Sequence, residues 1–268
     1  MSKVQSEHAF FWKWILRILI TPWILLLFFF GKRSWKEVMT PFVMLKEFFF
    51  EPKATVSLIL LNIILFVFSA FLPTDLLNQL VLYPSDLFEG RFYTIITAGF
   101  LHANLLHLFS NMLGLFIFGR IVERSLGPKK MLGIYFGAMV LAGIFHSLIA
   151  QYLLVDPTGA VGASGALLGL VSAAMLLDPW YLVYLFGIPI PVMVLSWITI
   201  LADITGVLQA TDDGIAHFAH LGGFLSIGIL MFFLGGKTKD QLKKGFFINI
   251  ISLMVLVSGY FLFQYLWF

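Results

Sequence analysis

The chain has 268 residues, of which 60% are hydrophobic and only 12% are charged, with a net charge of +3 and no cysteine. About a quarter of the residues of a typical soluble domain are charged, so this composition excludes a soluble globular domain. The missing cysteine excludes disulfide bonds and a cysteine nucleophile. Apolar runs of about 20 residues recur, which is the length that crosses a bilayer. The sequence therefore predicts an all-α, polytopic membrane bundle.

The N-terminal region begins with an apolar segment, 9–30, that is long enough to span a membrane. Lys13, Arg17 and a proline interrupt it, and the two basic residues lie four apart on one helical face. That arrangement is typical of a helix lying in the membrane interface. Together with the similar segment 41–50, it leads us to interpret 1–53 as a membrane-associated arm. A spanning helix over 9–30 is the alternative.

Seven further apolar segments are expected to span the membrane, at approximately 54–73, 95–119, 131–154, 161–177, 181–202, 216–235 and 246–267. The first six would form one core over 54–236. The seventh would be an extra transmembrane helix that follows a short cytoplasmic linker, both within 237–268. In the fourth segment Gly165, Gly169 and Ala173 repeat at four-residue spacing, which predicts close packing of a central helix.

The basic residues orient this bundle. Eight of the 17 lie in the first 53 residues, four lie between the second and third spans, and four lie between the sixth and seventh. The positive-inside rule puts those regions in the cytoplasm and the loops 74–94, 155–160 and 203–215 outside. We therefore expect a multi-pass protein of the cell membrane, with a cytoplasmic N-terminus if 9–30 does not span.

This orientation brings polar side chains from three spans to the outer leaflet. Ser164 and His217 lie in the first turns of the fourth and sixth spans, which both start outside. His102, His107 and Asn111 would lie in the outer half of the second span. His107 and Asn111 share one helical face there, whereas His102 lies about 140° round the helix. Polar and ionisable groups at membrane depth are costly and mark functional sites by default.

The residue types suit acyl transfer. A serine becomes a nucleophile when a base takes its proton, and a neutral imidazole is the usual base, so we expect Ser164 and His217 to form that pair. Backbone N–H groups at a helix start lack intrahelical partners, so those of Ser164 and Gly165 can stabilise an oxyanion. His107 and Asn111 can add side-chain donors. These groups form a complete acyl-transfer site.

The histidines allow two other arrangements, a catalytic triad and a metal site. The carboxylate nearest to His217 in sequence is that of Asp213, which we interpret as a solvated loop residue. No carboxylate is therefore expected to orient His217, and the sequence predicts a Ser–His dyad. His217 and His220, three apart on one face, could bind a metal together with His102 and His107. No Asp, Glu or Cys joins them within a span, so we expect neither a metal nor another cofactor. His220 is expected to support packing or hydrogen bonding beneath the base.

Four motifs resemble those of the rhomboid intramembrane serine proteases over roughly residues 54–236. They are GASG around Ser164, HANLLHLFSN at 102–111, AHFAHLGG at 216–223 and GRIVERSLG at 119–127. The order and spacing of the motifs are part of the resemblance. The GxSG pattern alone is weak, but the four together are specific.

The resemblance implies that Ser164 is the nucleophile and His217 the base, with His107 and Asn111 stabilising the oxyanion. It also implies that His102 helps to hold the outer loop. The implied fold is a six-helix core around a wet cavity, with 246–267 as the extra helix of a six-plus-one arrangement. The implied partners are membrane lipid and single-pass transmembrane substrates, cut in or near the membrane; no nucleic acid is expected.

Two positions depart from the family pattern. Many members carry Trp-Arg in the first outer loop, where this chain has Gly90-Arg91, and an aromatic residue often stands at the position of Leu168. The main rival function is a catalytically silent rhomboid-like protein that binds the transmembrane helices of client proteins, although such relatives typically lack the Ser or the His. A transporter is a weaker alternative, because the sequence shows no internal repeat.

Overall fold

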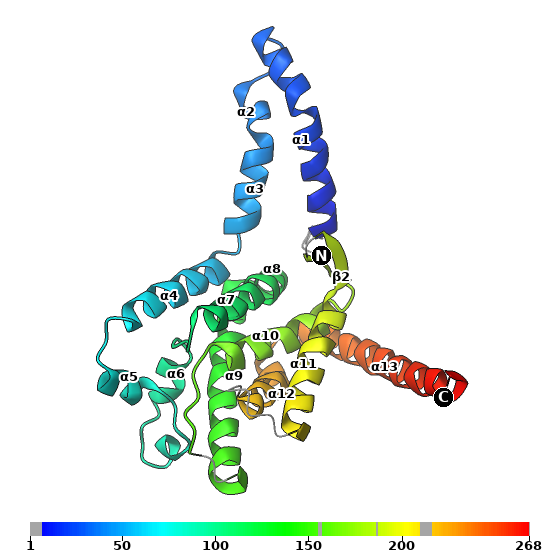
Figure 1. Ribbon diagram of the computed structural model, residues 1–268. Helices are drawn as coiled ribbons and strands as arrows, with labels where there is room; N and C mark the ends of the chain where they lie inside the picture. The colour runs from blue at the N-terminus through cyan, green and yellow to red at the C-terminus, as the bar shows by residue number, and fades with distance from the viewer. Residues whose placement is uncertain (1–6, 155–156, 186, 210–215, 268) are drawn as a thin grey trace.

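The computed structural model describes residues 7–154, 157–185, 187–209 and 216–267 (Figure 1). Within those ranges the regular secondary structure is helical apart from one short β-hairpin and one isolated bridge, which confirms the expected helical membrane fold. Five of the described helices are long and apolar enough to cross a membrane, and a sixth is if the bent pair Thr40–Phe50 and Lys53–Ser69 forms one span. Two shorter apolar helices, Ser164–Leu177 and His217–Phe233, complete the bundle.

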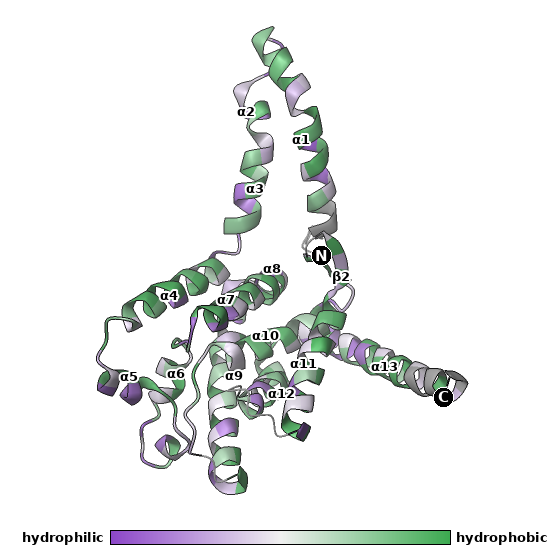
Figure 2. Cartoon of the chain, in the orientation of Figure 1, coloured by the Kyte–Doolittle hydropathy of each residue, from purple (hydrophilic) through white to green (hydrophobic). Residues whose placement is uncertain are grey.

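The N-terminal region forms a helical hairpin whose tip projects from the rest of the chain (Figure 1). At its base, Phe11 stacks on Tyr184 and the guanidinium of Arg120 lies over the ring of Phe48. Its helices are α1 (Glu7–Phe29), α2 (Trp35–Val38) and α3 (Thr40–Phe50). The indole of Trp14 donates to the carbonyl of Pro41 at 3.2 Å, which ties the two arms of the hairpin together. Figure 2 shows that both arms are largely apolar. Since α1 is long enough to cross a membrane, both interpretations of 9–30 stay open.

The helix α4 (Lys53–Ser69) corresponds to the first expected apolar segment, and its start is fixed by the segment GRIVERSLG. The Glu123 carboxylate accepts hydrogen bonds from the backbone N–H groups of Ala54 and Thr55, at 3.0 and 2.7 Å, and from the Thr55 hydroxyl at 2.7 Å. A carboxylate at a helix start satisfies unpaired donors and complements the helix dipole. Beyond α4 lie α5 (Thr74–Leu80) and the 3₁₀ turn η1 (Pro84–Leu87).

The second expected span starts later than predicted. Residues Thr94–Ala98 form a separate short helix, α6, and the long helix begins at Leu105. The cause is Asn104, which has extended backbone angles and whose side chain accepts from the N–H of His107 at 2.8 Å, as an N-cap does. His102 therefore lies in the loop before the helix, not on its outer half. The helix runs through α7 (Leu105–Gly114), η2 (Leu115–Gly119) and α8 (Arg120–Leu126).

The fifth expected span, 181–202, is also displaced. Its first part forms an antiparallel hairpin of β1 (Leu182–Leu185) and β2 (Ile188–Pro191), and the helix α11 occupies Val192–Gln209. Pro189 and Pro191 lack a backbone N–H and disfavour a helix, and Gly187 takes a φ of +84° at the turn. The stretch 203–209, expected in the outer loop, is therefore helical. Residues 210–215, including Asp213, lie outside the described residues.

The centre of the bundle is formed by α9 (Pro128–Ile149, extended by η3, Ala150–Leu154), α10 (Ser164–Leu177) and α12 (His217–Leu230, followed by η4, Met231–Phe233). Almost every residue of α10 is buried. A Cβ added to Gly165 would lie 2.7 Å from the Cβ of Ala142 on α9, and one added to Gly223 would collide with the carbonyl of Gly165. The expected close packing of a central helix through small residues is confirmed.

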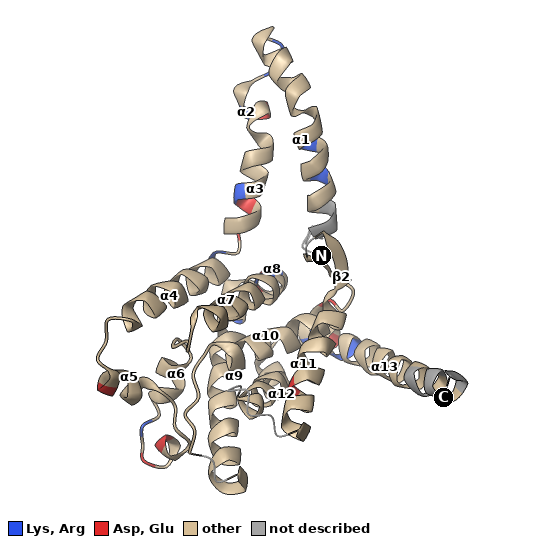
Figure 3. Ribbon diagram, viewed as in Figure 1, with Lys and Arg blue, Asp and Glu red and all other residues tan. Residues whose placement is uncertain are grey.

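The last helix, α13 (Gly236–Trp267), follows η4 after Leu234 and Gly235. Its Gln241 and Asn249 side chains donate to the carbonyls of Leu177 and Met175 at the end of α10, at 2.7 and 2.9 Å. These side chains satisfy carbonyls that lack helical partners. Figure 3 shows basic residues on the N-terminal hairpin and at the start of α13, and acidic residues at α5 and the loop after it.

Candidate active site

Ser164 is the first residue of α10 and is half-buried. The strand-like segment before it is fixed to the outer loop, because Leu82 and Ala160 exchange backbone hydrogen bonds and the N–H of Gly162 donates to the carbonyl of Ala98. Gly162 has a φ of +118°, which favours glycine. A small cavity beside Ser164 is lined largely by small residues, among them Gly162, Gly165, Ala142 and Ala219.

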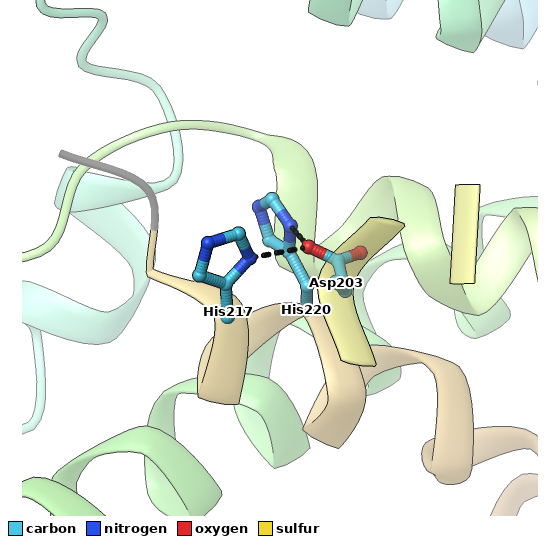
Figure 4. A group of neighbouring side chains, drawn as sticks. All are labelled: Asp203, His217 and His220. Atoms are coloured by element: carbon cyan, nitrogen blue, oxygen red, sulfur yellow. Dashed lines mark hydrogen bonds and ion pairs between the residues drawn. The ribbon is translucent and has the colours of Figure 1, made fainter. Parts of the chain in front are cut away.

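Three polar side chains meet where α11 packs against α12. The Nδ1 atoms of His217 and His220, both on α12, lie 2.9 and 2.7 Å from the same carboxylate oxygen, Oδ1 of Asp203. Figure 4 shows both rings turned toward this carboxylate, which comes from α11. An ionised carboxylate only accepts hydrogen bonds, so both rings carry their proton on Nδ1. In the neutral ring each Nε2 then has a free lone pair, and this tautomer can take a proton from a hydroxyl.

Asp203 is the residue that the sequence analysis missed. The prediction placed it at the edge of an outer loop, because the fifth span was expected to end at residue 202. In the structure Asp203 is buried inside an otherwise uncharged apolar helix. The statement that no carboxylate orients His217 is therefore wrong. A lone aspartate in the apolar stretch 192–209 was a usable signal, since an ionisable residue within a span marks a functional site.

The two histidines lie about 60° apart round α12 and have different neighbours. The side that packs on α10 is marked by Ala219, Gly223 and Ser226, which lie against Gly165 and Gly169. At 3.6 residues per turn, His220 is rotated about 60° from Gly223 and His217 about 120°. His217 packs against α11, since a Cβ added to Gly206 would collide with its ring. His220 instead lies close enough to His107 for their charges to interact.

His107 provides a donor next to the serine. Its Nδ1 accepts from the backbone N–H of Ala103 at 3.4 Å, so its Nε2 carries the proton in the neutral ring. A Cβ added to Gly162 would lie 2.7 Å from this Nε2 and 3.7 Å from the Ser164 hydroxyl oxygen. Asn111 is buried, and its amide donates to the carbonyl of His107 at 2.8 Å. The structure thus places His107 near Ser164, whereas the Asn111 amide is hydrogen-bonded within its own helix.

The loop before α6 is anchored by a buried carboxylate. Asp86 is fully buried, pairs with the guanidinium of Arg91 and accepts from the backbone N–H of Tyr83 at 3.0 Å. His102, also buried in this region, has its ring 5.2 Å from that of His107. Burial, with a smaller contribution from the charge of His107, lowers the pKa of His102 to about 4. His102 is therefore neutral at physiological pH.

A family model of the rhomboid domain matches residues 89–238, which include Ser164 and all of the histidines described above. The chain belongs to the rhomboid family. It is 30% identical over 213 residues to RHOMBOID-like protein 12, mitochondrial, of Arabidopsis thaliana, covering 72% of this chain and 60% of that protein. It is 27% identical over 205 residues to Rhomboid protease AarA of Providencia stuartii, with 66% and 70% of the two chains covered.

A third relative is Rhomboid protease GlpG of Photorhabdus laumondii, which is 27% identical over 179 residues. This match covers 66% of the present rhomboid chain and 59% of the relative. The chain therefore spans less than two thirds of the length of several curated relatives. Membership in the rhomboid family, together with the apolar helices, indicates a multi-pass membrane protein.

Proposed function

We propose that this rhomboid is an intramembrane serine endopeptidase. The Ser164 hydroxyl oxygen attacks the carbonyl carbon of a peptide bond in or near a transmembrane segment, and an imidazole Nε2 takes the hydroxyl proton. The C–N bond then breaks, and the imidazolium returns its proton to the leaving amine. Water hydrolyses the resulting acyl-enzyme with the same imidazole as base. Backbone N–H groups of Ser164 and Gly165 and the Nε2–H of His107 would stabilise the oxyanion.

The observation that carries this proposal is the hydrogen bonding of Asp203. Because its carboxylate accepts from both Nδ1 atoms, it holds His217 and His220 in the tautomer that can act as a base. This pair lies on α12, which packs directly against the helix that begins with Ser164. A serine with a base-competent histidine and nearby oxyanion donors is the arrangement that acyl transfer requires.

The identity of the base is part of the proposal. The sequence motif led us to expect His217, and that assignment stays a prediction. The side of α12 that faces α10 and His107 favours His220 instead, while His217 packs on Gly206 of α11. We therefore propose that the base belongs to this pair and that His220 is the stronger candidate. The two assignments make opposite predictions for the single alanine variants.

The substrates are proposed to be single-pass transmembrane proteins, in keeping with a family that acts on transmembrane substrates within the membrane. Small residues line the cavity beside Ser164, which favours a small substrate side chain at the cut. The N-terminal arm (1–53), the core (54–236) and the extra helix within 237–268 are proposed as three functional parts. Location in the cell membrane stays a prediction, since several relatives carry mitochondrial or chloroplastic names.

The alternative is a silent rhomboid-like protein that holds transmembrane helices without cutting them. One observation favours it: among the described residues, no hydrogen bond joins the Ser164 hydroxyl to a histidine. Catalytic hydrogen bonds are often long in unliganded enzymes and shorten with substrate, so this geometry is compatible with both functions.

The deciding experiment is cleavage of a generic transmembrane substrate by purified full-length protein, beside Ser164→Ala. A fluorophosphonate probe should label the wild-type chain and leave Ser164→Ala unlabelled. A wild-type chain that binds the substrate but neither cuts it nor takes up the probe would establish the silent alternative.

A further inference from the structure

We propose that Asp203, His217 and His220 form a binding site for a divalent transition-metal ion of the Zn²⁺ type. Each residue offers one ligand atom, and the three atoms lie within 4.8 Å of one another. They come from two helices, with the histidines one turn apart on α12 and the aspartate on α11 (Figure 4). The reason given from sequence for expecting no metal was the missing carboxylate, and Asp203 removes that reason.

The donor set matches the preference of zinc. Two imidazole nitrogens and one carboxylate oxygen are ligands that Zn²⁺ binds at about 2.0–2.2 Å, and sites with three protein ligands keep a fourth position for water. At a tetrahedral angle, such bonds put ligand atoms about 3.3 Å apart. Here the shared carboxylate oxygen is 2.7 and 2.9 Å from the two nitrogens. All three ligand atoms lie within 4.8 Å of one another, so adjustment of the side chains alone would bring them to the distances that the ion requires.

The surroundings favour capture of a cation from the outer side. The side chains of His217 and His220 keep 10% and 15% of their surface exposed, and that of Asp203 keeps 7%. His217 is the first residue of α12, so the site lies at the mouth of the bundle and not at its centre. The carboxylate supplies one negative charge in an apolar environment, where an opposite charge is worth more than in water.

Metal binding and proteolysis would exclude one another, a consequence that rests on the proposed function. The ion binds the lone pair of Nδ1, so each neutral ring must carry its proton on Nε2 instead. The Nδ1 proton leaves to water, and Nε2 takes one up, so the ring remains neutral and no net proton is released. A protonated Nε2 cannot accept the proton of Ser164. Bound Zn²⁺ would therefore act as a reversible inhibitor, whichever of the two histidines is the base.

Binding is tested first, without reference to activity. Tag-free, full-length protein in detergent is titrated with ZnCl₂ in competition with a fluorescent chelator. Replacing a residue that merely supports a zinc ligand costs 10–100-fold in affinity, so Asp203→Asn and His220→Ala should each weaken binding by at least about 100-fold. Ser164→Ala and His107→Ala are the matched controls, because they alter the same outer leaflet but keep all three ligands, and they should bind as the wild type does.

X-ray absorption on the wild-type protein covers the case in which a variant fails to fold. The expected spectrum has two imidazole nitrogens and carboxylate or water oxygens at about 2.0–2.2 Å. A spectrum without imidazole, or a His107→Ala variant that loses zinc while Asp203→Asn keeps it, would overturn the site.

Inhibition is tested second, by the rate of fluorophosphonate labelling of Ser164 with and without ZnCl₂. We expect labelling to fall in proportion to zinc occupancy and to return after addition of EDTA. Labelling that continues unchanged at full occupancy would overturn the coupling while leaving the site intact. A chain that binds zinc at the three ligands but never labels would support the metal site and overturn the proposed protease function, so the two failures are distinguishable.

Discussion

The Oδ1 atom of Asp203 lies 2.7 Å from Nδ1 of His220, across the contact between α11 and α12. This hydrogen bond joins α11 to α12. The sequence pattern predicted the start of α11 eleven residues too early, whereas α12 carries the histidine motif AHFAHLGG. It fixes the ring orientation as well as the tautomer, because the Nδ1 proton can point only at the carboxylate. The position of the proposed base thus depends on Asp203, which lies outside the recognised motifs.

Asp203→Asn is expected to abolish most catalysis with little change in stability. The asparagine amide can donate to Nδ1, which moves the imidazole proton to Nε2 and removes the base. In serine proteases with a Ser-His-Asp triad the same change lowers kcat about 10⁴-fold, so we expect a fall of about 10²–10⁴ in the rate of substrate cleavage. KM should stay within a few fold. The matched control is Asp178→Asn at the other end of α10, which should leave kcat unchanged.

The histidine pair is separated by two alanine variants. If His220 is the base, His220→Ala should lose fluorophosphonate labelling of Ser164, whereas His217→Ala should retain a measurable rate because Asp203 still orients His220. The labelling rate of each variant, with its melting temperature as the folding control, gives the answer. The reverse pattern would assign the base to His217, as the sequence motif predicted.

The oxyanion donors can be told apart from structural polar groups. Loss of one such donor costs about 10²–10³ in kcat, or roughly 3–4 kcal/mol. A hydrogen bond between membrane helices averages only about 0.6 kcal/mol. We expect His107→Ala to lower turnover strongly with little effect on melting temperature. The amide of Asn111 already donates to the carbonyl of His107 within α7, so it must leave this bond to reach an oxyanion. We therefore expect Asn111→Ala to lower turnover less than His107→Ala does.

Much of the scaffold was predictable because it depends on apolar length and on charge. The expected spans at 54–73, 131–154, 161–177 and 216–235 each correspond to a described helix or to a helix with its terminal turns. The small residues of the fourth span predicted its central place, since close approach of two backbones requires them. These features follow from local sequence alone.

Two displaced elements show where local sequence was insufficient. The run before α11 is as apolar as a span, but Gly187 and its neighbouring prolines make it a hairpin. The run before α7 is apolar too, yet the Asn104 cap starts the helix late. The first error moved Asp203 from a buried helix into a loop. The hydrogen bonds of Asp203 depend on the packing of α11 on α12, which no motif in the chain encodes.

The contact between α10 and α12 offers a stability test. A methyl group added to Gly223 would collide with the carbonyl of Gly165, whereas one added to Gly228 on the same helix meets open space. Overpacking a close contact costs about 1–3 kcal/mol, so Gly223→Ala should lower the melting temperature clearly. Gly228→Ala should leave it unchanged or raise it, since alanine favours a helix. Equal melting temperatures for the two variants would contradict the close approach of α10 and α12.

The buried ring of His102 predicts that acid destabilises the outer loop region. Burial lowers the pKa of His102 from its ordinary value of 6.5 to about 4 in the folded chain, so the unfolded chain binds more protons between these two pH values. Stability therefore falls as the pH is lowered through this window and is unaffected by His102 above it. At 1.36 kcal/mol per pKa unit, the full loss is about 3 kcal/mol.

The variant His102→Gln isolates this effect, because glutamine does not titrate. The other ionisable groups are the same in both proteins, so their contributions cancel in the difference. The difference in unfolding free energy between wild type and variant should be constant above about pH 7. As the pH falls to 4, the wild type should lose about 3 kcal/mol of unfolding free energy relative to His102→Gln. Thermal melting in detergent at half-unit pH steps measures it. A difference that is independent of pH from 7 to 4 would mean that the folded chain protonates His102 as readily as the unfolded chain does.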